Sequence, residues 1–206
     1  MPQTLLPPAL LDRNFFLGPP DRVALSLLGK LLIRKPDDPS DEPTIGRIVE
    51  VEAYFGANDP AAHAFAGKTA RNAVLFGPPG HAYVYFIYGM YHCLNVSCEP
   101  DGKAGCVLIR ALEPIAGLAT MTRRRNLPAN ARPRLLASGP GRLCQAMAIT
   151  RARHNGLDLT LAGSALTLAE DGFSSRRIET TPRIGIRHAA DRPLRFTVRG
   201  NPCLSK

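Results

Sequence analysis

The chain has 206 residues, of which 45% are apolar and 21% are charged. These proportions are typical of an ordinary globular protein and exclude a disordered, collagenous or coiled-coil protein. No run approaches 18 apolar residues, and residues 1–11 lack the features of a secretory signal, so we expect a cytoplasmic protein without a membrane span. Pro-rich stretches punctuate the chain without forming a linker, which predicts one domain over residues 1–206, with a loose N-terminal segment at residues 1–13.

The charge is distributed unevenly along the chain. Residues 1–103 contain 9 basic and 11 acidic side chains, whereas residues 104–206 contain 17 basic and 6 acidic ones. The net charge of +9 therefore comes from the second half. Such an excess indicates either a surface that faces a polyanion or a solvated arginine-rich face, and charge counts alone leave both interpretations open.

The five cysteines are Cys93, Cys98, Cys106, Cys144 and Cys203. Their number is odd and they form no CxxC pair, so reduced thiols are expected rather than a disulfide framework. Together with His92 they match no standard zinc-site spacing, so we predict no metal site.

The first half of the chain shows three patterned segments. Leucines and a valine spaced by three or four predict a helix over Asp21–Leu32, which begins after Pro20. Alternation over Thr44–Tyr54 predicts a strand with Arg47, Val49, Val51 and Ala53 on one face and Ile48, Glu50, Glu52 and Tyr54 on the other. Asp59-Pro60 resembles a helix start and predicts a short helix that carries His63 and ends at Gly67.

Two β-rich runs, Tyr83–Ile87 and Tyr91–Ser97, flank Tyr88-Gly89-Met90. A glycine accepts positive φ at a turn, so this pattern predicts a β-hairpin with a tyrosine at its end. Gly105–Leu112 predicts the next strand, and Glu113-Pro114 predicts the start of a helix that ends in Arg123–Arg125.

The last part of the chain mixes one helix with short strands. Ser138-Gly139-Pro140 predicts a helix start, and four later segments read as strands: Leu157–Leu161, Ala165–Leu168, Arg183–Arg187 and Arg195–Arg199. The whole pattern predicts an α+β fold with a mainly antiparallel sheet.

Three kinds of residue are candidates for chemistry. All five tyrosines lie between Tyr54 and Tyr91, and they suit either base stacking or an ordinary packed hairpin. Glu52 is either a general base or a structural partner of Arg47 or another cation. A histidine such as His63, considered alone, is more often structural than a ligand.

The ordered series of motifs resembles the alkyladenine (3-methyladenine, or methylpurine) DNA glycosylase family. The motifs are Val49-Glu50-Val51-Glu52-Ala53-Tyr54, His63, Thr69-Ala70-Arg71-Asn72, Tyr83–Tyr91, Asn95, Arg110-Ala111-Leu112-Glu113-Pro114, Ser138–Ala146 and Arg195–Gly200. The resemblance runs from about residue 14 to 202. It implies one domain with a curved, mainly antiparallel sheet, surrounding helices and a protruding hairpin.

The resemblance also implies roles for individual residues. Glu52 matches the base that activates a water, and Arg110 matches a residue close to that water. Tyr54, His63, Tyr85 and Asn95 match the pocket for a flipped base, where Asn95 disfavours guanine. Tyr88 matches the wedge that enters the minor groove, and the contacts expected with DNA are Arg71, Gly89, Met90, Arg142 and Arg199.

The implied activity is hydrolytic excision of alkylated purines such as 3-methyladenine, with hypoxanthine and ethenoadenine as further candidates. No lysine lies in the catalytic stretch or the hairpin, so we expect no lyase step, and the implied reaction uses no cofactor. The expected partner is double-stranded DNA with damaged purines, bound by a monomer. A non-catalytic nucleic-acid-binding protein and a hydrolase for a small anionic substrate are the alternatives, and steep salt dependence of binding separates DNA from the latter.

Overall fold

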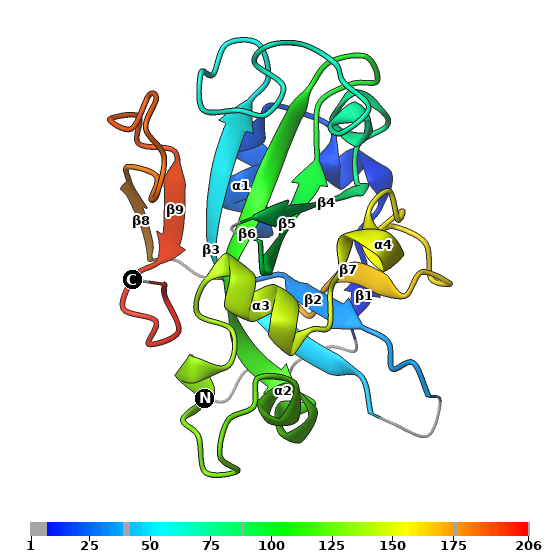
Figure 1. Ribbon diagram of the computed structural model, residues 1–206, viewed down its shortest axis with the longest axis vertical. Coiled ribbons are helices and arrows are strands. Elements are labelled where there is room, and N and C mark those ends of the chain that lie inside the picture. Colours follow the sequence, from blue (N-terminus) through cyan, green and yellow to red (C-terminus); the bar gives the residue numbers. More distant parts are fainter. Residues whose placement is uncertain (1–7, 39–41, 88, 175–176, 206) are drawn as a thin grey trace.

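An antiparallel β-sheet runs through the molecule (Figure 1). The computed structural model describes residues 8–38, 42–87, 89–174 and 177–205. The strands are β1 (Ala9–Leu10), β2 (Leu31–Arg34), β3 (Thr44–Phe55), β4 (Ala82–Ile87), β5 (Tyr91–Ser97), β6 (Gly105–Ala116), β7 (Leu166–Glu170), β8 (Ile178–Thr181) and β9 (Arg195–Val198). Every strand pair in the described part of the chain is antiparallel, which confirms the predicted α+β class.

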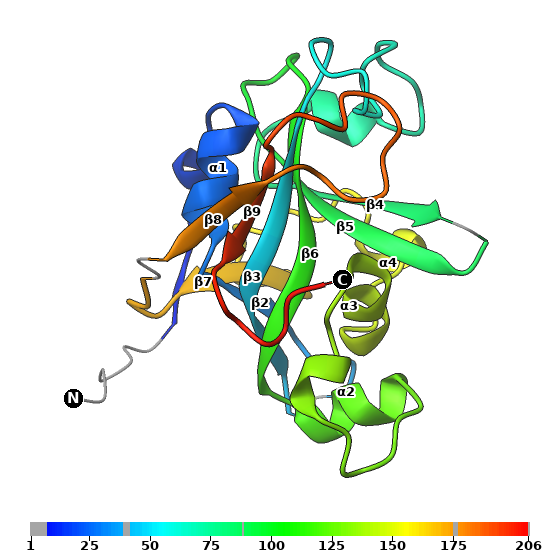
Figure 2. The same ribbon diagram turned by 90° about the vertical axis from the view of Figure 1, so that its left-hand side faces the viewer.

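Short helices cover both faces of this sheet. They are α1 (Pro20–Leu27), α2 (Leu118–Arg124), α3 (Pro140–Ala146) and α4 (Arg151–His154), with 3₁₀ turns at η1 (Arg13–Phe16), η2 (Ala73–Phe76) and η3 (Pro133–Leu135). Figure 2 shows α1 on one side of β3 and β6 and α3 on the other. The main apolar core lies between α1 and the sheet and continues beneath α3.

The strand order is β1-β7-β2-β3-β6-β5-β4, and β9, which also pairs with β8, adds to β3. The two longest strands, β3 and β6, form the centre of the sheet. β5 pairs with β6 only over Asn95–Ser97, so the outer part of the β4–β5 hairpin protrudes from the body (Figure 2). The predicted hairpin is thereby confirmed, except that Tyr88 at its end lies outside the described residues.

Two predicted helices have different bounds. The first ends at Leu27, because Gly29 takes a φ of +86° and Leu31–Arg34 then pairs with both β3 and β7. The helix expected from Glu113 begins only at Leu118. Glu113 and Pro114 instead extend β6, since they pair with Arg47 and Gly46 of β3.

Several shorter predictions also differ from the structure. Ala9–Leu10 pairs with β7, so the loose segment expected at residues 1–13 does not include these residues. Leu157–Leu161 forms an isolated bridge at Asp158 rather than a strand. The strands expected near residues 165 and 195 are present as β7 and β9, whereas β8 was not expected.

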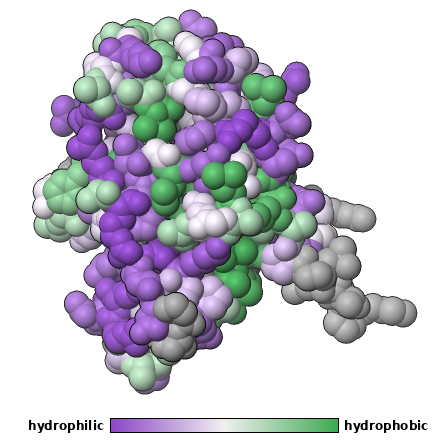
Figure 3. All heavy atoms as spheres, turned by 90° about the vertical axis from the view of Figure 1, so that its right-hand side faces the viewer, coloured by the Kyte–Doolittle hydropathy of each residue, from purple (hydrophilic) through white to green (hydrophobic). Residues whose placement is uncertain are grey.

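The surface is mixed in character. Figure 3 shows a face on which hydrophilic residues predominate and apolar residues form small groups. All five cysteines are unpaired and buried. Among the described residues, no helix has the length and apolarity needed to span a bilayer, and no three His, Cys, Asp or Glu side chains gather as a metal ion would require.

Candidate active site

Paired bulges in β3 and β6 shape the site. The Cα partners in this region are Ile48↔Leu112, Glu50↔Ala111 and Val51↔Ile109, so Val49 and Arg110 have no opposite partner. A bulge re-aims the side chains of its strand. Val51 packs in the main core, whereas Val49 joins a separate cluster with Ala111 and Cys203. The expectation that Val49 and Val51 share one face is therefore wrong, because alternation does not continue through a bulge.

Glu52 is fully buried, and protein groups hold both of its carboxylate oxygens. Oε1 accepts the backbone N–H of Ile184 at 2.8 Å and lies 3.1 Å from Nη1 of Arg110. Oε2 accepts the Tyr54 hydroxyl at 2.8 Å. Although burial opposes the charge, the carboxylates of Glu52 and Glu50 raise the pKa of Arg110 above its usual value, so this guanidinium is charged beside Glu52.

Arg47, the structural partner considered for Glu52, lies elsewhere. Its guanidinium forms a two-point contact with Asp171, at 3.0 and 2.7 Å. The structure therefore places Glu52 with Arg110 and not with Arg47.

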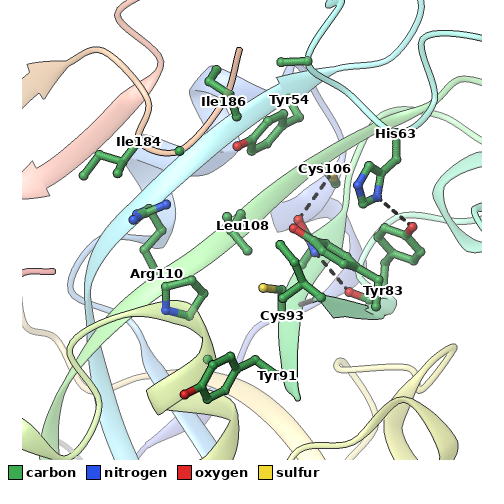
Figure 4. Close-up of a pocket in the computed structure, with 17 residues that line it drawn as sticks. Tyr54, His63, Tyr83, Tyr91, Cys93, Cys106, Leu108, Arg110, Ile184 and Ile186 are labelled. Carbon is green, nitrogen blue, oxygen red and sulfur yellow. Dashed lines mark hydrogen bonds between the residues drawn. The ribbon is translucent and has the colours of Figure 1, made fainter. Parts of the chain in front are cut away.

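A cavity of about 350 Å³ opens beside this cluster (Figure 4). The predicted site residues Tyr54, His63, Tyr85, Asn95 and Arg110 all line it. The other lining residues are Ala61, Tyr83, Ile87, Tyr91, Cys93, Cys106, Leu108, Pro140, Gly141 and Ile184–Ile186. The three groups that contact the Glu52 carboxylate, from Tyr54, Arg110 and Ile184, thus all belong to residues that border the cavity.

The hairpin supplies an aromatic wall. The His63 ring lies 4.4 Å from the Tyr85 ring in an edge-on arrangement, and its Nδ1 is 2.9 Å from the Tyr83 hydroxyl. Asn95 donates from Nδ2 to the Tyr83 carbonyl at 3.3 Å (Figure 4). Burial raises the pKa of Tyr83 to about 12 and also raises that of Tyr85, so both phenols are neutral near pH 7.

His63 lies on turns rather than on the short helix expected there. Asp59 accepts the N–H groups of Phe55 and Ala61, and Asn72 donates to the carbonyl of His63 at 2.9 Å. These side-chain bonds stabilise turns in place of helical hydrogen bonds. Partial burial of the ring, together with the nearby Arg71, lowers the pKa of His63, so the imidazole is neutral near pH 7.

A loop that follows β8 closes the opposite side. Arg183 donates to both oxygens of Asp59, at 2.5 and 2.8 Å, and both residues are buried. Its guanidinium also lies 4.5 Å from the centre of the Tyr54 ring. These contacts replace the strand expected at Arg183–Arg187, and they hold the N–H of Ile184 against Glu52.

The DNA contacts expected at the hairpin end are described only in part. Tyr88 lies outside the described residues. Gly89 has a φ of +67°, as the turn requires, and the side chain of Met90 is 65% exposed. The described part of the turn therefore presents an apolar side chain to solvent.

The three arginines expected at DNA have different positions. Arg71 is exposed, and its charge lowers the pKa values of His63 and Tyr83 at the cavity, although burial outweighs it for Tyr83. Arg142 is exposed on α3, directly after Gly141, which borders the cavity. Arg199 is exposed after β9 and does not line the cavity, so the structure leaves it apart from the pocket.

Sequence reasoning did not identify Glu50, Tyr83 or Ile184 as site residues. Glu50 shares the alternating face of Glu52, and Tyr83 belongs to the tyrosine cluster, so both carried a signal. Ile184 contributes only a backbone N–H, which leaves no mark in the side-chain pattern.

Comparison with known proteins identifies the family of the chain. The family model described as "Methylpurine-DNA glycosylase (MPG)" matches residues 14–202. A relative from Koribacter versatilis is 56% identical, over 96% of this chain and 93% of its own length, and one from Methanocella arvoryzae is 49% identical over 96% of each. Both carry the name "Putative 3-methyladenine DNA glycosylase". The chain belongs to the methylpurine-DNA glycosylase family.

Proposed function

We propose that the protein is a monofunctional DNA glycosylase that binds double-stranded DNA as a monomer and removes alkylated purines, 3-methyladenine among them. One observation carries this proposal. A fully buried carboxylate, Glu52, is held by three groups whose residues all line an aromatic-walled cavity. A protein that only binds DNA has no use for a carboxylate buried next to a polyanion.

The proposal includes extrusion of the target base into the cavity. The glycosidic bond inside a stacked duplex is inaccessible, so an enzyme that cuts it must rotate the nucleotide into a pocket. At about 350 Å³ the cavity lies within the range of about 300–1,000 Å³ that is usual for small-molecule sites. The hairpin that forms its wall also protrudes from the body, where it can enter a groove of DNA (Figure 2).

The proposed chemistry uses water as the nucleophile. Oε2 of Glu52 accepts one bond, from Tyr54, and its second lone pair can orient a water. As the bond between C1′ and the purine nitrogen breaks, the purine takes the bonding electrons. The water oxygen then bonds to C1′ while its proton passes to Glu52. Before it takes the proton, the Glu52 carboxylate also stabilises the positive charge that develops on the sugar.

The aromatic wall supports selection of alkylated bases. Methylation at a purine ring nitrogen makes the base cationic, and the faces of Tyr54 and Tyr85 attract a cation by about 0.5–2 kcal/mol. Neutral lesions such as hypoxanthine and ethenoadenine lack this attraction, so we propose them as weaker substrates than the cationic bases. Asn95, buried in the wall, is the proposed residue that disfavours the amino group of guanine.

The test is release of free methylpurine from methylated duplex DNA by the purified protein, in the presence of a chelator. We expect release with an intact abasic strand, and no covalent protein–DNA adduct after borohydride treatment. Release accompanied by a trapped adduct and a cleaved strand would replace the monofunctional assignment with a lyase mechanism. Salt-sensitive DNA binding without any release would instead favour the non-catalytic binding protein.

A further inference from the structure

A second buried carboxylate, Glu50, lies two residues before Glu52, and neither carboxylate is itself among the residues that line the cavity. It accepts four hydrogen bonds from three residues. Oε1 accepts Nε of Arg110 at 2.8 Å, Nε of Arg195 at 2.8 Å and the Ser205 hydroxyl at 2.7 Å, and Oε2 accepts the Ser205 N–H at 2.6 Å. Although burial opposes it, the donors of Ser205 and Arg195 hold the pKa of Glu50 below its usual value, so the group is charged.

The bulges and the segment after β9 bring these groups together. Glu50 is next to the unpaired Val49, and the unpaired residue of β6 is Arg110 itself. Cys203 packs with Val49, and Leu204 packs against their cluster, which fixes Ser205 over Glu50. The arrangement therefore joins β3, β6, β9 and residues 203–205 at one point behind the cavity.

The guanidinium of Arg110 is divided among three partners. Nε donates to Glu50, Nη2 donates to the Ser205 hydroxyl at 3.2 Å, and only Nη1 faces Glu52, at 3.1 Å. A free arginine fork prefers a two-point contact with a carboxylate. Without Glu50, the fork of Arg110 can rotate onto Glu52 and occupy the lone pairs that a water needs.

The balance of charges also indicates that Glu52 needs Glu50 in order to act as a base. Glu50 and Glu52 face Arg110 and Arg195, and Asp59 balances Arg183 close by, so the cluster is neutral overall. Loss of the Glu50 charge leaves an excess positive charge beside Glu52. Such a charge makes a carboxylate a weaker base.

We propose that Glu50, together with Ser205, is a positioning residue of the active site, which holds the Arg110 guanidinium so that Glu52 keeps a free lone pair for the attacking water. This inference rests on the proposed function, in which Glu52 is the base. Glu50 itself touches neither substrate nor reacting atoms.

The first test compares Glu50→Gln with wild type in single-turnover release of methylpurine. We expect the rate constant to fall about 10- to 100-fold, as misplaced catalytic groups do, while affinity for abasic duplex DNA stays within about 2-fold. Glu113→Gln is the matched control, because Glu113 is likewise a carboxylate on a central strand, here β6, and accepts a bond from Asn201 of the same segment after β9, at 3.0 Å. This control should retain the wild-type rate.

The pH profile separates positioning from general damage. Glu52 is faced by Arg110 of β6, by Tyr54 of β3, by Arg183 of the loop and by the Cys93 thiol of β5. Loss of the Glu50 charge leaves Arg110 less compensated, and the added positive charge favours the negatively charged form of the site. The acid limb of the rate profile should then move to lower pH in Glu50→Gln.

Ser205 provides a second set of variants should Glu50→Gln fail to fold. Ser205→Ala removes one donor to Glu50 and should slow release several-fold, whereas Ser205→Thr keeps the hydroxyl and should restore most of the rate. If Glu50→Gln and Ser205→Ala both release methylpurine at the wild-type rate, this inference is overturned while the proposed function stands. A slower rate with an unmoved acid limb, and with no advantage of threonine over alanine, would also overturn it. Failure of the wild type to release any purine would overturn both this inference and the proposed function.

Discussion

The floor of the cavity and the hairpin beside it hold their side chains by different forces. The floor consists of β3, β6 and the loop after β8, where charged groups are buried and fixed by pairing with opposite charges. The hairpin consists of β4 and β5, where aromatic rings pack on one another and the outer end is exposed, as at Met90.

This difference matches two different tasks. Hydrogen bonds and ion pairs depend on direction, so a buried network fixes a carboxylate to within a narrow range of positions. Ring contacts depend less on direction and accept rings of different outline. In the proposed function, the molecule therefore combines a rigid floor for one bond cleavage with a tolerant wall for bases that differ in shape.

The largest expected effect comes from breaking the floor at Arg183. Arg183→Met leaves the buried Asp59 carboxylate without its cation, and removal of one partner from a buried pair costs about 3–5 kcal/mol. We expect the free energy of unfolding in urea to fall by about this amount. Purine release should fall too, because the loop presents the Ile184 N–H to Glu52.

Arg192→Met is the matched control for that variant. Arg192 lies on the same segment and donates to the carbonyl of Asn58, but it is not buried with a carboxylate. Its replacement should change the free energy of unfolding by less than about 1 kcal/mol. Equal losses in the two variants would contradict the importance of the Arg183–Asp59 pair.

A smaller effect is expected at the wall. Tyr85→Leu removes one aromatic face from the cavity and with it an attraction for cations of about 0.5–2 kcal/mol, or about 2- to 30-fold. Release of cationic methylpurines should slow by this factor relative to a neutral lesion in the same duplex. Phe86→Leu, at the next and more exposed position of β4, should leave the ratio unchanged. If Tyr85→Leu slows release of the cationic and the neutral lesion equally, Tyr85 contributes only to the shape of the cavity.

The smallest effect is expected at the surface near the cavity mouth. Arg142→Ala should reduce DNA affinity modestly and reduce the slope of log K against log salt by about 1, which corresponds to the loss of one phosphate contact. The helix α1, which contains Arg22, lies on the side of the sheet opposite α3 (Figure 2), so Arg22→Ala should leave the slope unchanged. Identical slopes for wild type and Arg142→Ala would remove Arg142 from the DNA contact surface.

Much of the fold could be predicted from local patterns. The long strand at Thr44 and the hairpin at residues 83–97 show clear alternation or β-branched and aromatic enrichment, and both are present. The helix expected from Glu113 begins only at Leu118, because pairing of Glu113 and Pro114 with β3 outweighs the local start signal. Such long-range pairing is not visible in a single short window of sequence.

The sequence predicts the residues of the candidate site but not the contacts that hold them in place. The residues Glu52, Tyr54, His63, Tyr85, Asn95 and Arg110 do come together. The bulges at Val49 and Arg110 leave no sequence signal, so the shared contacts of Glu50, Arg110 and Ser205 could not be foreseen. The same holds for Ile184, whose contribution is a backbone group.

The most direct test of the account is the single-turnover rate of methylpurine release by Glu52→Gln. The amide keeps the shape of the side chain but cannot take a proton from water, so we expect a loss of about 100- to 10,000-fold. DNA affinity should stay close to wild type, and Glu113→Gln should release purine normally. Release by Glu52→Gln at the wild-type rate would contradict the assignment of Glu52 as the base and return it to a structural role.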